Sequence, residues 1–195
     1  NIHQPSYLRT AFPTSFNDKT YVLVGINPNL IWDSPQSFES IKLLAQILGG
    51  YPVAVSDAEE STFLDSFRSS ATREAFFARY PNMNCGNPER MLQDGCWTLF
   101  DYVVSSGMLI GLTADNETCQ YNWLSGEPLS YTQWYENPPP EDACSKPYVT
   151  STSIGWSAGS HIYTPGVLEL PSSITDEQLE QTRQFIIDNL LFKDF

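Results

Sequence analysis

One segment of this chain, residues 110–144, restricts the fold more than any other because it combines bulky aromatic side chains with loop-forming residues. It reads IGLTADNETCQYNWLSGEPLSYTQWYENPPPEDAC and contains two tryptophans, three consecutive prolines, two cysteines and six carboxylates. It has little of the apolar periodicity that builds helices. A chain that orders such a segment needs a folded base to hold it, so the remaining residues must supply that base.

The length and composition favour one globular domain, alone or with additions. The chain has 195 residues, of which 41% are hydrophobic and 13% aromatic, enough to bury a real core. Its net charge of −13 argues against binding to nucleic acid or to an anionic membrane surface, because both need clustered Lys and Arg. No run approaches the ~20 apolar residues of a membrane span. A calcium ion or a basic partner is compatible with this charge.

The first part of the chain alternates between predicted strands and helices. TYVLVGI (20–26) and YPVAVS (51–56) are typical of strands. Between them, DSPQSFESIKLLAQILGG (33–50) predicts a helix that begins at the N-cap Ser34 and ends at Gly49. The apolar stripe of this helix comprises Phe38, Ile41, Ala45 and Leu48.

A second helix is predicted over SDAEESTFLDSF (56–67), opened by a capping box of Ser56 and Glu59. Its core-facing side chains are expected to be Phe63, Leu64 and Phe67. Three strands are predicted later, over SGMLIGLTA (106–114), SIGW (153–156) and GVLELP (166–171). The first of these is a continuous apolar run, which indicates a buried strand.

The chain closes on a predicted helix, ITDEQLEQTRQFIIDNLLF (174–192), with a capping box of Thr175 and Gln178. Helices early and strands late indicate an α+β fold. We expect an N-terminal arm over 1–19, a domain over 20–171 with an insertion at about 70–107, and a C-terminal helical extension over 172–195.

Four cysteines, Cys85, Cys96, Cys119 and Cys144, allow two disulfides in three pairings. No CxxC occurs and the chain has two histidines, which disfavours zinc. Four free thiols in a reducing compartment are the alternative. The sequon Asn116-Glu117-Thr118 predicts a glycosylation site and fits an extracellular protein. A chain that starts at Asn1 fits a mature protein or an excised segment.

At four places the sequence resembles C-type lectin-like domains. SFESIKLLAQILGGYPVAVSDAEESTFLDSF is similar to the first half of such domains, with a helix that ends in Gly-Gly and a second helix that begins near Glu-Glu. Leu109-Ile110-Gly111-Leu112 stands where the family has Trp-Ile-Gly-Leu, and the segments Trp123 to Trp134 and Glu136 to Cys144 resemble its central motifs. GWSAGSHIYTPGVLELP is similar to its final strands, so the resemblance covers roughly 20–171.

The resemblance implies two helices flanking short antiparallel sheets, with a long loop region laid on a compact base. In that fold the buried anchors of the loop region would be Trp123, Tyr131 and Trp134, as core rather than as a ligand platform. The two usual bridges of the family lack a cysteine here, because Ala45 occupies the helix position and no cysteine follows Cys144. The resemblance then implies the pairs Cys119–Cys144 and Cys85–Cys96.

The residues that bind calcium in sugar-binding members of the family are altered in this chain. Glu136-Asn137-Pro138 replaces Glu-Pro-Asn, and Trp156 is followed by Ser157 and Ala158 instead of Asn-Asp. Calcium takes six to eight oxygen ligands, so an ion held by the remaining loop residues would be weak and open. Those residues are Glu136, Asn137, Glu141 and Asp142. A solvated acidic loop is the simpler interpretation, and we expect no cofactor, with calcium the one candidate.

The sequence therefore predicts an extracellular or cell-surface recognition module that binds a protein or a glycan, without the usual calcium-dependent sugar site. Beside the loop residues, Tyr135 and Tyr148 are candidate contact residues. The alternatives are a calcium-dependent lectin that uses the 136–142 loop, and a structural spacer in a larger surface protein. An enzyme is disfavoured, although the formylglycine-generating enzymes share a distantly related fold, because no histidine accompanies a cysteine and no nucleophile or nucleotide motif occurs.

Overall fold

A mixed sheet organises the computed structural model, which describes residues 10–24, 34–79, 107–135, 139, 141–160, 166–178 and 180–181. The strands are β1 (Thr10–Phe16), β2 (Lys19–Val24), β3 (Tyr51–Pro52), β4 (Met108–Ala114), β5 (Tyr121–Trp123), β6 (Tyr148–Thr152), β7 (Gly155–Gly159) and β8 (Gly166–Pro171). The helices are α1 (Ser34–Ile47), α2 (Ala58–Arg79) and the short 3-10 helix η4 (Ala143–Ser145). This is the α+β C-type lectin-like fold that the sequence predicts.

The strand order among the described residues is β1-β2-β8-β4-β6-β7, with β3 paired to β8 and β5 paired to β4. All pairs are antiparallel except β4 with β8, which run parallel. The short antiparallel strands that the resemblance implies are present, and among the described residues they join into one mixed sheet through the parallel pair. The parallel pair joins two long-range partners, which periodicity within each strand does not reveal.

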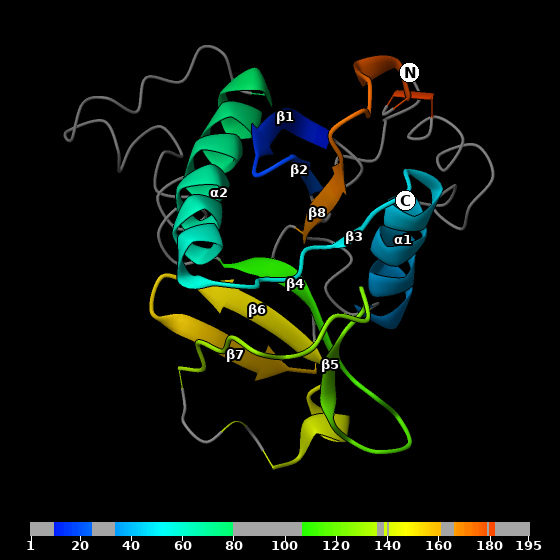
Figure 1. The fold of residues 1–195 in the computed structure, drawn as a ribbon, viewed down its shortest axis with the longest axis vertical. Helices are drawn as coiled ribbons and strands as arrows, with labels where there is room; N and C mark the ends of the chain where they lie inside the picture. Colours follow the sequence, from blue (N-terminus) through cyan, green and yellow to red (C-terminus); the bar gives the residue numbers. More distant parts are fainter. Residues whose placement is uncertain are drawn as a thin grey trace.

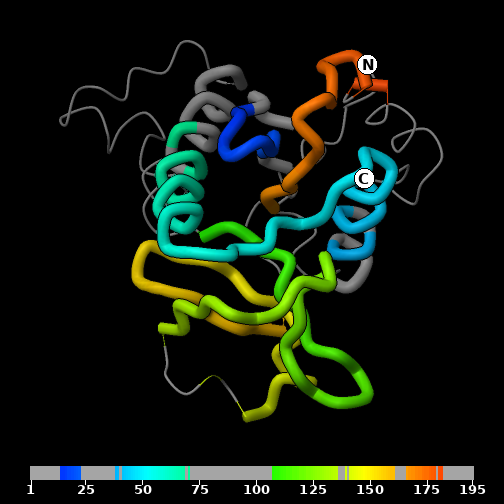
Figure 2. The backbone as a smooth tube through the Cα atoms, in the orientation of Figure 1, coloured from blue at the N-terminus to red at the C-terminus, as the bar shows by residue number. Residues whose placement is uncertain are grey.

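The fold has two parts, which Figures 1 and 2 show as the upper and lower halves of the molecule. The base contains β1, β2, β3, β8, α1 and α2. The loop half contains residues 107–160, with β4 to β7 and the connections between them. The β4 strand crosses between the halves through its pairing with β8.

Helices α1 and α2 cover opposite faces of the sheet. Along β8, Leu168 and Leu170 pack with the α1 cluster, whereas Val167 packs with the α2 cluster. The same alternation occurs in β2, where Val22 faces α1 and Tyr21 faces α2. A strand covered on both faces reads as a continuous apolar run, which explains why β4 was predicted directly from its sequence, whereas β8 carries the buried Glu169 among its apolar residues.

The apolar stripe and the C-terminal end of helix α1 are as predicted, whereas the side chain of its predicted N-cap, Ser34, lies outside the described residues. Its stripe of Phe38, Ile41, Ala45 and Leu48 is buried. Gly49 takes a φ of +79°, and the amides of Gly49 and Gly50 donate to the carbonyls of Gln46 and Ala45. These two bonds satisfy carbonyls at the helix end.

Helix α2 begins one residue later than its predicted capping box. Asp57, not Ser56, caps it, because Oδ1 of Asp57 accepts a hydrogen bond of 2.8 Å from the amide of Glu60. Glu60, not Glu59, reaches back, and its Oε2 accepts bonds from the amide and hydroxyl of Ser56. Leu64 and Phe67 are buried as predicted, and Phe63 is half-buried.

Three parts of the chain differ from the expected outline. Residues 10–16, expected within an arm, form β1, and α2 continues to Arg79 through the first part of the expected insertion. Strands β5 and β6 were not predicted.

Near the C-terminus, Thr175 and Gln178 form the predicted capping box. The Thr175 amide donates to the Gln178 side chain at 2.9 Å, and the Gln178 amide donates to the Thr175 hydroxyl at 3.2 Å. Cys85 and Cys96 lie outside the described residues.

Candidate functional site

The loop half opens with a tight turn after β4, organised by the carboxylate of Asp115. Its Oδ1 accepts hydrogen bonds from the amides of Glu117 and Thr118, at 2.9 and 2.8 Å, and from the Thr118 hydroxyl at 3.1 Å. These bonds hold the pKa of Asp115 below its ordinary value, because they favour the charged carboxylate. The sequence places Asp at this position because its short side chain can reach amides two and three residues ahead.

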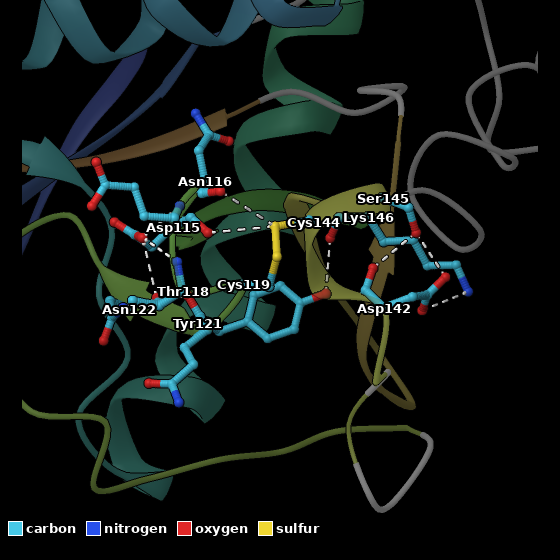
Figure 3. Close-up of a disulfide and its surroundings, with 12 residues drawn as sticks. Asp115, Asn116, Thr118, Cys119, Tyr121, Asn122, Asp142, Cys144, Ser145 and Lys146 are labelled. Atoms are coloured by element: carbon cyan, nitrogen blue, oxygen red, sulfur yellow. Dashed lines mark hydrogen bonds and ion pairs between the residues drawn. A yellow bond between two sulfur atoms is a disulfide. The ribbon is translucent and has the colours of Figure 1, made fainter.

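A disulfide between Cys119 and Cys144 ties this turn to helix η4 (Figure 3). The pairing implied by the family resemblance is confirmed. The Cys144 sulfur lies 3.6 Å from the carbonyl oxygen of Asp115, a packing contact, since a disulfide sulfur has no hydrogen to donate. The Tyr121 hydroxyl adds a second link by donating to the carbonyl oxygen of Lys146 at 2.8 Å. Segments 25 residues apart in sequence are thereby fixed together.

Trp156 is the centre of an aromatic cluster beneath the loop region. It is 1% exposed, and the rings of Trp123, Tyr131 and Trp134 meet it edge to face, with centroids 5.5, 6.1 and 5.8 Å away. Edge-to-face packing suits the quadrupoles of aromatic rings. Trp123 is buried, while Tyr131 and Trp134 are half-buried. The tryptophans therefore anchor the loop region inward, as predicted.

The long connection after β5 returns to the sheet and pairs with β7. The Trp156 amide donates to the Gln133 carbonyl at 2.7 Å, and the Tyr135 amide donates to the Trp156 carbonyl at 3.0 Å. Gly155 permits this approach, because a Cβ there would lie 2.7 Å from the Gln133 carbonyl oxygen. The Gln133 side chain also accepts a bond of 2.7 Å from the hydroxyl of Ser61 on α2. The loop is thus bound to both halves of the molecule.

Two of the four predicted calcium-ligand residues lie on the surface beyond this anchored segment. Glu141 and Asp142 are exposed, and Glu136 and Asn137 lie outside the described residues. Asp142 accepts a bond of 2.7 Å from the Ser145 hydroxyl and lies 3.7 Å from the Lys146 ammonium. The Ser145 bond is the main cause of its lowered pKa. Within the described ranges, no group of three or more His, Cys, Asp or Glu side chains is placed to hold a metal ion.

Of the two candidate contact tyrosines, the structure exposes one. Tyr135 is 61% exposed. Tyr148 is 9% exposed, so its assignment as a contact residue is wrong. Its ring packs on Phe38 of α1 with centroids 5.1 Å apart, and burial raises the pKa of its hydroxyl. It belongs to β6, a strand of β-branched and aromatic residues (YVTST) that was not predicted, and that composition is the signal in the sequence.

Ile154, in the turn between β6 and β7, is a surface residue that the sequence analysis missed. It is 68% exposed, more than the other large hydrophobic side chains that the structure describes as exposed. Gly155 next to it is packed against the backbone of Tyr135. Tyr135 and Ile154 therefore lie on neighbouring segments, and we call them the exposed pair.

A second group of charges is buried in the base and was also not predicted. Glu60 and Glu169 are 4% and 6% exposed and share the Lys19 ammonium, at 3.7 and 2.6 Å. Tyr21 donates to Glu60 at 2.6 Å, and the Ala54 amide donates to Glu169 at 3.0 Å. Burial raises the pKa of Glu169, although Lys19 and Ala54 oppose the shift. Ser56, which donates to Glu60, is a near neighbour in sequence. The other partners of the two glutamates are remote in sequence, so no local pattern indicates the group.

Comparisons with solved structures show what the fold is similar to. The mouse scavenger receptor C-type lectin carbohydrate-recognition domain superposes with a TM-score of 0.53 and 16% identity, over 84% of this chain and 96% of that one. The cow C-type carbohydrate-recognition domain of CD23, solved in the presence of a GlcNAc2Man3 oligosaccharide, gives 0.52 and 15%, over 83% and 95%. A calcium-independent type II antifreeze protein gives 0.50 and 12%, over 84% and 96%.

No protein-family model and no curated protein matches the sequence. At these identities, the structural matches show the C-type lectin-like fold and nothing finer. That fold, together with a disulfide, is typical of extracellular domains. None of the described helices is both long and apolar enough to cross a bilayer.

Proposed function

We propose that the chain is an extracellular recognition module that binds a protein or a glycan without the usual calcium-dependent sugar site. The observation that carries the proposal is the composition of β7 after Trp156. Ser157 and Ala158 follow it, so this strand offers neither the carboxylate nor the amide oxygen that calcium would need. Trp156 itself keeps the buried position of a core anchor. Binding, not catalysis, is the activity of this module.

Rigidity of the loop half supports a binding role. The disulfide, the aromatic cluster around Trp156 and the pairing of residues 133–135 with β7 hold a segment that has little regular structure. A surface that is already ordered loses less conformational entropy when a partner binds. The consecutive prolines at 138–140 restrict the unfolded chain in the same sense.

The exposed pair supplies a contact surface of suitable chemistry. Tyr135 offers a large amphipathic ring, and Ile154 offers apolar area, the kinds of side chain that are enriched at the centre of protein interfaces. The loop acids Glu141 and Asp142 are polar neighbours in the same half, and Glu136 and Asn137 follow Tyr135 in sequence. We assign these six residues to the binding face.

Glycan-array screening of the chain in calcium and in EDTA tests the proposal, together with capture of extracellular proteins. The expected result is binding that EDTA leaves unchanged, lost in Tyr135→Ala or Ile154→Ser and kept in Gln181→Ala, an exposed control. Binding that needs calcium would refute the proposal. Binding that neither substitution weakens would show that the binding face lies elsewhere on the molecule.

A calcium-dependent lectin is the second candidate, favoured by the likeness to the cow CD23 carbohydrate-recognition domain, which was solved in the presence of an oligosaccharide. The likeness to a calcium-independent antifreeze protein argues against it, because a protein of similar fold works without the ion. Thermal unfolding in calcium and in EDTA separates the two. We expect no difference in Tm, and a calcium-induced rise that is lost in Glu136→Ala and Glu141→Ala would establish the lectin.

A spacer domain in a larger surface protein is the third candidate. It predicts that the chain captures no glycan and no protein, and that Tyr135→Ala and Ile154→Ser have no effect on any surface property of the full protein. The exposed pair separates the two candidates, because the binding module requires these side chains at its contact surface and the spacer does not.

A further inference from the structure

The turn between β4 and β5 displays the N-glycosylation sequon Asn116-Glu117-Thr118, which is the one such sequon in the sequence. All three residues are exposed. Asn116 contributes its backbone carbonyl to the contact with Cys144, whereas its side chain points away from the disulfide (Figure 3). The amide nitrogen of Asn116 is therefore open to solvent, as the acceptor of a bulky oligosaccharide has to be.

We propose that Asn116 carries an N-linked glycan that is added before Cys119 and Cys144 pair. Nδ2 of Asn116 attacks C1 of the reducing sugar of a lipid-linked oligosaccharide. The new bond from nitrogen to C1 replaces the bond from C1 to the pyrophosphate oxygen, and the lipid pyrophosphate leaves with the electron pair. The amide loses one proton to a base of the transferase. The inference rests on the proposed passage through a secretory compartment, and not on the identity of any partner.

The folded turn explains the order of events. The Thr118 hydroxyl, which completes the sequon, is bound to the Asp115 carboxylate, and so is the Thr118 amide. The Cys119 amide donates to the Asp115 carbonyl at 2.8 Å, and Cys119 is held at a φ of +53°. A transferase needs the sequon as an accessible segment, so this turn has to open first. The disulfide opposes that opening because it anchors the turn to η4.

The position of the glycan also bears on the binding face. The carbonyl oxygen of Asn116 lies 3.8 Å from the Cys144 sulfur, so a glycan there stands beside the disulfide. Figure 1 shows the β6–β7 turn at the other end of the loop half from the β4–β5 turn. The glycan would stand at the disulfide end of the loop half, where Asp142 is the N-cap residue of η4, and would leave the Tyr135 and Ile154 part of the binding face free for a partner.

Secretion of the full chain from glycosylating eukaryotic cells tests the site. We expect peptide-N-glycosidase to increase the mobility of the secreted protein and to leave Asp at position 116, read by mass spectrometry. Asn116→Gln and Thr118→Val should each abolish the shift, and Thr118→Ser should retain it. Asn122→Gln is the matched control, since Asn122 is an exposed asparagine in the same half without a sequon. Secreted, disulfide-bonded protein with unmodified Asn116 would overturn the proposal, whatever the binding experiments give.

Glycosylation in vitro tests the order. Unglycosylated chain is offered to an oligosaccharyltransferase with a lipid-linked donor, once reduced and unfolded, and once folded with the Cys119–Cys144 bridge verified. We expect transfer to the unfolded chain, and for the folded chain a signal no higher than that of Asn116→Gln. Equal transfer to both forms would overturn the order. Absence of transfer to either form would overturn the site.

Discussion

The carboxylates of the base and those of the loop half differ in their burial and in the sequence distance to their hydrogen-bond partners. In the base, Glu60 and Glu169 are buried, and each accepts a hydrogen bond from a distant residue: Tyr21 is 39 positions from Glu60, and Ala54 is 115 positions from Glu169. In the loop half, Asp115 and Asp142 are exposed and are bound by residues three positions away. The base is therefore held by long-range contacts, whereas the loop half is held by local turns together with a few strong anchors.

The difference shows how a chain can keep a variable surface on a fixed fold. Local turns and one disulfide hold the loop half without requiring a particular outer side chain. The base cannot vary in that way, because removing one partner leaves another charge buried without compensation. The four predictions below test this contrast, in order of decreasing effect.

Loss of the central anchor should have the largest effect. Trp156→Ala removes a buried ring that contacts three other aromatic side chains, so we expect a loss of about 3–5 kcal/mol in the free energy of unfolding. Tyr135→Ala, which removes an exposed ring, should change it by less than about 0.5 kcal/mol. Denaturant titration measures both. Similar losses in the two variants would mean that the loop half has no core of its own.

Loss of the disulfide should come next. Replacing Cys119 and Cys144 together by Ser opens a loop whose ends are 25 residues apart, which should lower the free energy of unfolding by roughly 3 kcal/mol. Hydrogen exchange should show the loss of protection in the turn at 115–119 while β2 and β8 stay protected. Equal loss in β8 would show that the two halves are not independent.

Loss of the shared cation is expected to have a smaller effect. Lys19→Met leaves Glu60 and Glu169 buried without their ammonium, but Lys19 is 38% exposed, so solvent screens part of the interaction. We expect a loss of about 2 kcal/mol in the free energy of unfolding, below the usual range for a fully buried pair. Lys42→Met, which removes a surface ion pair with Glu39, is the control and should have almost no effect. Equal effects would show that water reaches the buried carboxylates.

Acid should act in opposite directions on the two regions, with the smallest effect. Glu169 has a raised pKa, so the folded state takes up its proton before the unfolded chain does. As pH falls from neutral towards 4.5, wild type should therefore gain stability relative to Glu169→Gln. Asp115 has a lowered pKa, and its contribution is complete above 3.8 and lost below it. Wild type should then lose stability relative to Asp115→Asn.

Thermal unfolding of the three proteins across this pH range checks both signs. A Tm difference between wild type and Glu169→Gln that moves in the other direction on acidification would show that Lys19 dominates the environment of Glu169. The outcome for Glu169→Gln does not depend on the outcome for Asp115→Asn, because Glu169 lies in the base and Asp115 lies in the loop half.

The sequence was sufficient where the interactions are local or where burial is continuous. The end of α1 at Gly49, the capping box of Thr175 and Gln178, and the apolar strands β4 and β8 are all encoded within a few residues. Helix α2 was placed correctly but began one residue off, because Ser56, Asp57 and two glutamates all fit a helix start. Only the geometry selects Asp57 and Glu60.

The sequence was insufficient where a residue depends on a distant partner. Nothing near Glu60 indicates Tyr21 or Lys19, and nothing near Gln133 indicates that its carbonyl meets the Trp156 amide. Tyr148 was a candidate contact residue, but Phe38 of α1, 110 positions away in sequence, packs against its ring. The binding face itself stays a prediction, since Glu136 and Asn137 lie outside the described residues.

The missing Cβ of Gly155 has a consequence for how the molecule behaves among its own copies. Residues 133–135 reach β7 through that gap and occupy backbone groups that would otherwise lie open along the last strand of the sheet. Unoccupied strand margins invite another polypeptide to add itself. At the opposite margin, β1 carries Pro13 and an irregular register between Ala11 and Thr14, which discourages addition there as well. Among the described residues, the amide and carbonyl of Trp156 on the β7 margin are already paired within the chain and are closed to a neighbouring copy.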